Sequence, residues 1–321
     1  MTIKITSEKF SLASAFTISR GTKTHAEVIV VTVGDGTFLG RGECVPYGRY
    51  EETIESVTRQ IEKLPSDVTL KTLHSVLPAG AARNAVDCAL WDLEAKKSGT
   101  SVWKMTGEVE PKPLTTAYTL SLDAPAVMQE NAKANAYRPL LKIKLGGPND
   151  LSRLEAVRTG APDAEIIIDA NEGWTEPVWL ALQQDLQDLG VVLVEQPLPA
   201  TKDQCLADHE HMVPLCADES CHTSLELAQL KDRYEFINIK LDKTGGLSEA
   251  LITRERAIEL GLGIMVGCMV GTSLGMAPAI LLAQGAKFVD LDGPLLLAED
   301  RPNGLRYDGS IVYPPTTDFW G

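Results

Sequence analysis

Two lysines, Lys142 and Lys144, lie one residue apart inside the apolar segment Leu140-Leu141-Lys142-Ile143-Lys144-Leu145. The segment is typical of a short β-strand, in which alternate side chains share a face, so both ammonium groups point the same way. Burial and a neighbouring like charge both lower the pKa of a lysine toward the range of a general base. The alternative is an edge strand whose lysines prevent aggregation.

Acidic residues follow three later strand-like segments. Asp169, Glu195 and Asp218 each come directly after an apolar run. In a barrel of parallel strands the carboxyl ends meet at one rim, where three carboxylates would repel one another without a cation. Oxygen ligands without histidine or thiol favour Mg²⁺ over Zn²⁺. A single acid at a strand end would more simply cap the next helix, but three in succession favour a metal site.

A further lysine, Lys240, ends the next strand-like segment, Phe236 to Leu241. On the sixth strand of an eight-stranded barrel it would lie across the mouth from Lys144 on the second. Two facing bases can remove a proton from one side of a carbon and return it on the other, while a metal stabilises the enediolate. This predicts a racemase or epimerase acting α to a carboxylate, with Lys142 lowering the pKa of Lys144 and helping to bind the carboxylate.

The rest of the chain supplies the elements that such a site needs. From about residue 113, β-rich segments recur with helix-like stretches between them, one of which begins at the N-cap Thr175 and stops at Gly190. Their spacing of about 25 residues suits a barrel, whereas an open doubly wound sheet would carry a Gly-x-Gly-x-x-Gly turn. The segments are 114–120, 140–145, 165–170, 191–195, 214–217, 236–241, 261–266 and 287–291.

The first hundred residues mix a strand, Glu27 to Val33, with a helix, Ala82 to Lys97, that ends at Gly99. We therefore predict an α/β protein: a (β/α)7β TIM-like barrel over residues 113–300, with an α+β capping domain over residues 1–112. The Pro-containing tail, residues 301–321, is expected to pack on the capping domain and complete it.

The composition limits the classes of molecule that the protein is expected to bind. The 321 residues carry a formal net charge of −14, which argues against nucleic acid and suits a cation. We expect no membrane contact and a cytoplasmic location, because no apolar run reaches spanning length and Met1 to Lys4 does not begin a signal peptide. The six cysteines form no Cys-x-x-Cys pair, as in proteins of a reducing compartment. A homo-oligomer is compatible with this sequence.

The strand ends together carry a recognisable series of motifs. They are Lys142-Ile143-Lys144, Asp169-Ala170-Asn171, Glu195-Gln196-Pro197, Asp218-Glu219-Ser220 and Asn238-Ile239-Lys240. The series resembles the muconate-lactonizing subgroup of the enolase superfamily over nearly the whole chain, and within it the bacterial L-Ala-D/L-Glu epimerases. The resemblance implies one Mg²⁺ per subunit on Asp169, Glu195 and Asp218, with Lys144 and Lys240 as the two bases.

Specificity is expected from the eighth strand and from two lid loops of the capping domain, near residues 20 and 50. Asp290 and Asp292 share a strand face and can accept hydrogen bonds from a substrate ammonium, unless they are simply solvated acids at a strand end. The resemblance points to Lys23, more than to its neighbour Arg20, for the glutamate side chain. A lysine there would hold a carboxylate less tightly than an arginine. Further wall residues are expected at Tyr47, Thr119, Cys268 and Met269.

The predicted function is Mg²⁺-dependent epimerisation of the glutamate α-carbon in L-Ala-D/L-Glu dipeptides, with a role in recycling murein peptides. Epimerisation of other dipeptides, and a cycloisomerase or o-succinylbenzoate synthase on the same scaffold, are the alternatives within enzymes. A non-catalytic metal- or peptide-binding barrel is the alternative outside them, but a binder has no need of bases on two sides.

Overall fold

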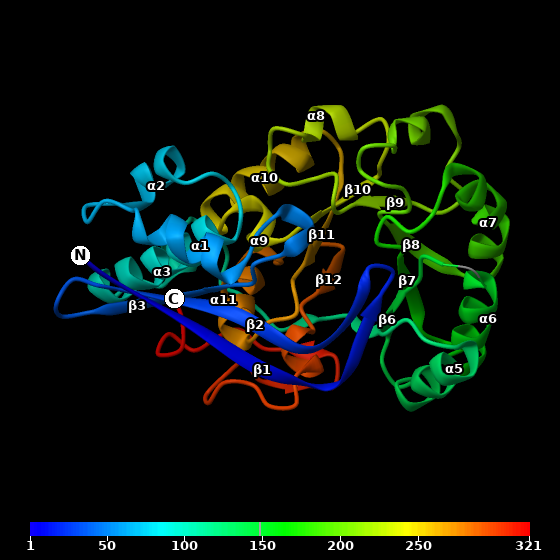
Figure 1. Ribbon diagram of the computed structural model, residues 1–321, viewed down its shortest axis with the longest axis horizontal. Helices are drawn as coiled ribbons and strands as arrows, with labels where there is room; N and C mark the ends of the chain where they lie inside the picture. Colours follow the sequence, from blue (N-terminus) through cyan, green and yellow to red (C-terminus); the bar gives the residue numbers. More distant parts are fainter. Residues whose placement is uncertain (148) are drawn as a thin grey trace.

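The structure, a computed structural model, describes residues 1–147 and 149–321, and Figure 1 shows two parts side by side. In the capping part, three strands form an antiparallel sheet in the order β1 (Thr2–Ile18), β2 (Gly21–Gly34) and β3 (Leu39–Cys44). Apolar residues of β2 and β3 share a core with three helices. These are α1 (Ile54–Glu62), α2 (Leu70–Val76) and α3 (Ala81–Ser98), and a 3-10 turn, η1 (Gly48–Tyr50), precedes them.

The second part is an eight-stranded parallel sheet, which confirms the predicted barrel. A hydrogen bond from the Ala117 amide to the Val289 carbonyl, 2.8 Å long, brings its first and last strand segments together. The strands are β5 (Tyr118–Leu120), β6 (Leu140–Lys144), β7 (Glu165–Asp169), β8 (Val191–Glu195), β9 (Leu215–Ala217), β10 (Phe236–Ile239), β11 (Gly263–Gly267) and β12 (Phe288–Asp290).

Helices follow most of the barrel strands, and none in the described part of the chain is long and apolar enough to cross a membrane. Helix α7 begins after Thr175, as predicted, although the Thr175 side chain makes no capping hydrogen bond. Before the barrel lies α4 (Val102–Met105). The helices among the barrel strands are α5 (Pro125–Ala134), α6 (Asp150–Gly160), α7 (Glu176–Asp188), α8 (Leu227–Leu230), α9 (Leu241–Thr244), α10 (Leu247–Glu259) and α11 (Ser273–Leu282), and the 3-10 turns are η2 (Gln204–Asp208) and η3 (Gly293–Leu296).

The orientation of strand β6 decides between the two interpretations of its lysines. β6 lies between β5 and β7, and Leu140 packs with apolar residues of the other strands inside the barrel. Lys142 and Lys144 share its face, and their residues are only 1% and 8% exposed. The edge-strand interpretation is therefore wrong, because the lysines point into a closed interior.

The predicted first strand, residues 114–120, is split in two. Its first part, β4 (Leu114–Thr115), leaves the barrel and pairs with β14 (Ile311–Val312), which in turn pairs with β13 (Tyr307–Asp308). The chain then runs to the capping part, where Gly321 accepts a hydrogen bond from the Val102 amide. Figure 1 shows the C-terminus on that side of the molecule. The boundaries at residues 112 and 300 stay predictions.

One buried carboxylate joins the capping part to the barrel. Asp87 of α3 accepts hydrogen bonds from the Ser248 amide (3.0 Å) and the Ser248 hydroxyl (2.6 Å), in the first turn of α10. It thereby caps a barrel helix from the other part. Burial raises the pKa of Asp87 to about 6, against the helix-terminal donors that lower it.

We expect Asp87→Asn to change how stability depends on pH. A carboxyl whose pKa is raised in the folded state adds most to the free energy of unfolding when the pH is below its unfolded pKa. That stabilisation is lost as the pH rises through the folded pKa of about 6. As the pH rises from 4.5 to 7, the free energy of unfolding of the variant should therefore rise by roughly 2 kcal/mol relative to that of the wild type, measured by urea unfolding. Asp308→Asn, at an exposed acid, is the control. Parallel pH curves for wild type and Asp87→Asn would contradict this.

Candidate active site

The charged residues predicted from strand ends meet at the carboxyl-terminal rim of the barrel. Lys144 is paired in register with Asp169, and Asp169 with Glu195. Asp218 follows the last residue of β9, and Lys240 follows the last residue of β10. The carboxylates of the three acids are 0–3% exposed, so neighbouring groups, not water, must balance their charge.

Lys142 is the centre of this charge network. Its Nζ lies 2.6 Å from Glu195 Oε2, 2.8 Å from Asp290 Oδ2 and 3.1 Å from Asp169 Oδ2. Burial lowers the pKa of Lys142, but the carboxylates of Asp290, Glu195 and Asp169 outweigh it and hold the pKa well above its usual value. The expectation that crowding lowers the pKa of this lysine is wrong here, because its nearest charged neighbours are acids.

The two predicted bases each contact a different acid of the set. Lys144 Nζ lies 2.5 Å from Asp169 Oδ2, and Lys240 Nζ lies 2.6 Å from Asp218 Oδ2. β6 and β10 are four strands apart in the eight-stranded order, so the two lysines come from opposite sides of the barrel. Burial lowers the pKa of Lys240, and the carboxylates of Asp218 and Glu195 more than reverse the effect.

The three acids offer a suitable donor set for a hard divalent cation. One carboxylate oxygen from each of Asp169, Glu195 and Asp218 lies within 4.8 Å of the others. Oxygen donors of this kind suit Mg²⁺, which is bound through a few carboxylates while substrate or water completes its octahedron. Buried anions at this separation also require positive charge, which the surrounding lysines supply in part.

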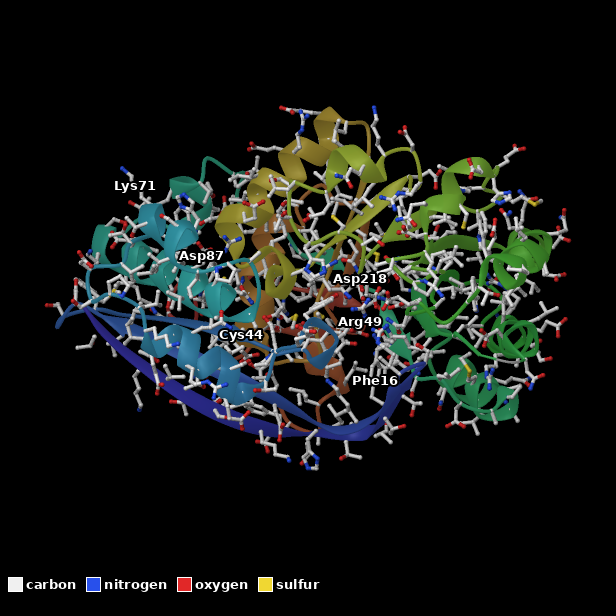
Figure 2. All side chains as sticks on the ribbon, turned by 45° about the horizontal axis from the view of Figure 1, so that its top comes forward. Phe16, Cys44, Arg49, Lys71, Asp87 and Asp218 are labelled. Atoms are coloured by element: carbon white, nitrogen blue, oxygen red, sulfur yellow. The ribbon has the colours of Figure 1, made fainter. Side chains whose placement is uncertain are left out.

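A cavity of about 360 Å³ opens above the barrel rim between the two parts. Every residue predicted for the site lines it except Asp169 and Glu195. Figure 2 shows Phe16 and Arg49 near Asp218, where the β1–β2 hairpin tip and the η1 turn meet the barrel. The predicted lid loops near residues 20 and 50 therefore form the wall opposite the lysines.

Arg20 and Lys23, the two basic residues of the hairpin tip, differ in their surroundings. Arg20 donates hydrogen bonds to Glu219 Oε1, the Tyr47 hydroxyl and the Asn171 carbonyl, each 2.8 Å long. Lys23 has its Nζ 5.2 Å from the centre of the Tyr47 ring, and burial lowers its pKa. Both residues line the cavity, but Arg20 is engaged in holding the hairpin to the barrel, whereas the Lys23 side chain makes no hydrogen bond or ion pair with the described residues.

The eighth strand presents its two acids in different states. Asp290 Oδ2 contacts Lys142, while Asp290 Oδ1 is buried without a hydrogen-bond partner among the described residues. Asp292 Oδ2 accepts a hydrogen bond of 2.6 Å from the Thr119 amide. Burial and the Asp290 charge raise the pKa of Asp292 to about 7. Cys268 and Met269, beyond β11, line the same end of the cavity.

The sequence interpretation gave no role to several residues that orient the acids. Asn238 donates a hydrogen bond of 2.7 Å to Glu195 Oε1, and Gln196 Oε1 accepts one of 2.9 Å from the Asp218 amide. Lys243 contacts Asp218 directly. Glu172, also missed, holds Arg49 of the η1 turn through both carboxylate oxygens, so it positions the cavity wall and not the acids. Asn238 and Gln196 both belong to the strand-end motifs. Asn238 lies two residues before Lys240 and so shares its strand face, and this spacing could have predicted that Asn238 points into the barrel.

Comparison with known proteins agrees with this geometry. Residues 1–107 match the model of the mandelate racemase / muconate lactonizing enzyme N-terminal domain, and residues 126–304 match the enolase C-terminal domain-like model. The chain belongs to the enolase superfamily, in the mandelate racemase / muconate lactonizing enzyme group, which confirms the resemblance.

Particular relatives are similar over almost their full length. An enolase family member from Agrobacterium tumefaciens, described as homologous to dipeptide epimerases and solved with bound sodium and L-Ala-L-Glu, is 56% identical, with a TM-score of 0.98 and 99% of each chain covered. The L-Ala-D/L-Glu epimerase of Escherichia coli K12 is 44% identical over 95% of this chain and 97% of the relative. The N-acetyl-D-glutamate racemase of Pseudoalteromonas sp. is 45% identical over 92% and 95%.

We expect Gly267→Ala to disturb Glu195 through Asn238. A Cβ at Gly267 would lie 2.6 Å from Asn238 Oδ1 and 2.7 Å from Nδ2, so the amide that holds Glu195 must move. The overpacking should lower the free energy of unfolding by about 1–3 kcal/mol in urea titrations. Gly48→Ala, whose added Cβ meets no atom within 4 Å, is the control. Equal stability of the two variants would show that Asn238 adjusts freely.

Proposed function

We propose that this protein is a dipeptide epimerase that inverts the glutamate α-carbon of L-Ala-D/L-Glu by two-base 1,1-proton transfer. The observation that carries the proposal is the placement of Lys144 and Lys240 on strands from opposite sides of one cavity, with three carboxylates on the strands between them. An isomerase that inverts a centre needs an acid–base group on each face of the carbon.

In the proposed mechanism, the α-carbon of the substrate lies between Lys144 and Lys240. The lysine on one face, in its neutral form, removes the α-proton, and the ammonium on the other face donates a proton to the planar carbanion. The Lys142 ammonium adds positive charge beside the substrate carboxylate as negative charge develops there. Reversal of the two roles converts the product back, so the reaction runs in both directions.

Asp169, Glu195 and Asp218 are the proposed ligands of one Mg²⁺ per subunit. When bound, Mg²⁺ would supply Lewis-acid stabilisation of the substrate carboxylate. By competing for the three carboxylates, it would also lower the pKa values of Lys142 and Lys240, which those carboxylates hold above the usual value. The donor set, all hard oxygens within 4.8 Å of one another, supports this choice over a softer metal.

The substrate termini are assigned by charge. The unpartnered Asp290 Oδ1 and the neighbouring Asp292 carboxylate are proposed to accept hydrogen bonds from the α-ammonium of the dipeptide. Lys23 is proposed to pair with the side-chain carboxylate of glutamate, because Arg20 already contacts Glu219, Tyr47 and Asn171. Tyr47, Thr119, Cys268 and Met269 are proposed wall residues.

The cellular setting follows from the same substrate. An enzyme for L-Ala-D/L-Glu would act on peptides released from murein, and we propose a cytoplasmic location. The six cysteines, all free in the structure, suit a reducing compartment. A cycloisomerase or o-succinylbenzoate synthase is disfavoured, because substrates without an ammonium would leave Asp290 Oδ1 buried and unpaired.

The direct test is incubation with L-Ala-L-Glu and Mg²⁺ in D₂O. We expect deuterium at the glutamate α-carbon and formation of L-Ala-D-Glu, followed by NMR. Lys240→Ala should reduce inversion by at least about 100-fold, because one of two acid–base groups is lost, while exchange on the face served by Lys144 can persist. Lys287→Ala, at an exposed lysine at the opposite end of the barrel, is the matched control. Normal inversion by Lys240→Ala would remove that lysine from the mechanism.

Asp292→Asn should change the choice between substrates with and without an ammonium. The amide keeps an acceptor for the Thr119 amide but loses the charge that the ammonium requires. We expect kcat/KM for L-Ala-L-Glu to fall roughly 10- to 100-fold, and that for N-acetyl-L-glutamate to fall less. Asp308→Asn is the control. An unchanged ratio of the two values would exclude Asp292 from ammonium recognition.

A further inference from the structure

Lys243 is a buried ammonium close to the site that does not line the cavity. It lies on α9, three residues after Lys240, and its side chain is 0% exposed. Its Nζ lies 2.6 Å from the Asp218 carbonyl oxygen, 2.6 Å from Asp218 Oδ1 and 2.9 Å from the Asn238 carbonyl oxygen. The three N–H groups of the ammonium thus have three acceptors, two of which belong to Asp218.

Asp218 depends on such contacts because it lies outside the strand ladder. β9 ends at Ala217, and its pairing with β10 stops at the same residue. The amide of Asp218 is held by Gln196 Oε1 at 2.9 Å, and its carbonyl accepts hydrogen bonds from Lys243 and, at 3.0 Å, from the Cys221 amide. The carboxylate itself lies between two ammonium groups, with Oδ1 on Lys243 and Oδ2 on Lys240.

We propose that Lys243 is a positioning residue for Asp218, and that it fixes the carboxylate so that Oδ2 faces Lys240 and the metal site. The inference rests on the proposed function in taking Asp218 as a ligand. Lys243 binds Oδ1, the carboxylate oxygen of Asp218 that does not contact Lys240. The carboxylate therefore cannot rotate about its Cβ–Cγ bond without breaking a buried charged contact. Groups that orient metal ligands in this way commonly decide the affinity of the site.

The direction in which metal affinity changes on removal of Lys243 distinguishes a positioning role from a purely electrostatic one. Removing a positive charge next to a ligand carboxylate should strengthen cation binding if electrostatics alone acts. Removing an orienting contact should weaken it, typically 10- to 100-fold for groups behind the ligands. The two interpretations therefore predict opposite changes for Lys243→Met.

The experiment measures binding of Mg²⁺ alone by calorimetry, and of Mn²⁺ by electron paramagnetic resonance, to the full-length protein. For Lys243→Met we expect the dissociation constant to rise 10- to 100-fold at an unchanged far-ultraviolet circular dichroism spectrum. The matched control is Arg254→Met, which removes another buried cation, paired with Glu108 and away from the cavity. It should leave the metal affinity unchanged even where it lowers the melting temperature.

An unchanged or tighter dissociation constant for Lys243→Met would overturn the proposal. If Lys243→Met does not fold, Lys243→Gln is titrated instead. This variant removes the same charge but can keep at most two of the three hydrogen bonds, so the dissociation constant should rise by less than about 10-fold, and an unchanged or tighter value again overturns the proposal. The readout needs no substrate. Failure of the wild type to exchange the α-proton of L-Ala-L-Glu would therefore count against the proposed function, and the metal titration would still decide the role of Lys243.

Discussion

The rest of the site depends on one constraint, the balance of charge inside the barrel mouth. Asp169, Glu195, Asp218, Asp290 and Asp292 are all nearly inaccessible to water, as are Lys142, Lys144, Lys240 and Lys243. Removing an ion-paired member, such as Lys142 or Asp218, leaves its partners buried with less opposite charge beside them. With all nine groups ionised, the five carboxylates exceed the four ammonium groups by one negative charge. The proposed Mg²⁺ together with a dipeptide of net charge −1 would cancel it.

This constraint explains which parts of the site could be predicted from sequence. A lysine or an acid at the end of an apolar run stands out from its neighbours, so the strand-end residues Lys144, Asp169, Glu195 and Lys240 mark the rim of the barrel in the sequence itself. The strand pattern predicts the barrel for a related reason, because its period and spacing follow from parallel strands covered by helices. What that pattern missed was local, such as the departure of β4 toward β14.

The direction of the pKa shift of Lys142 could not be predicted, because it depends on distances between strands. Lys142 and Lys144 are neighbours in sequence, which indicated mutual repulsion. In the folded chain Lys142 instead contacts Asp290, which lies 148 residues away in the sequence. Arg20 and Glu219 also make contact from distant parts of the sequence. The contact of Lys243 with Asp218 depends on the side-chain rotamers that both residues adopt. Sequence spacing carries no information on either.

The two parts of the molecule divide the work in a way that favours changes of substrate. The groups proposed for proton transfer and metal binding all belong to barrel strands and their ends, where each is tied to the others. Lys23 belongs to the hairpin of the capping part, and its ring contact is with Tyr47 of the same part. Arg20 keeps the hairpin attached to the barrel independently of Lys23. With Lys23 in its proposed pairing with the substrate side chain, a substitution at residue 23 would alter the side chain that is accepted without disturbing the charge balance on which the proposed chemistry depends.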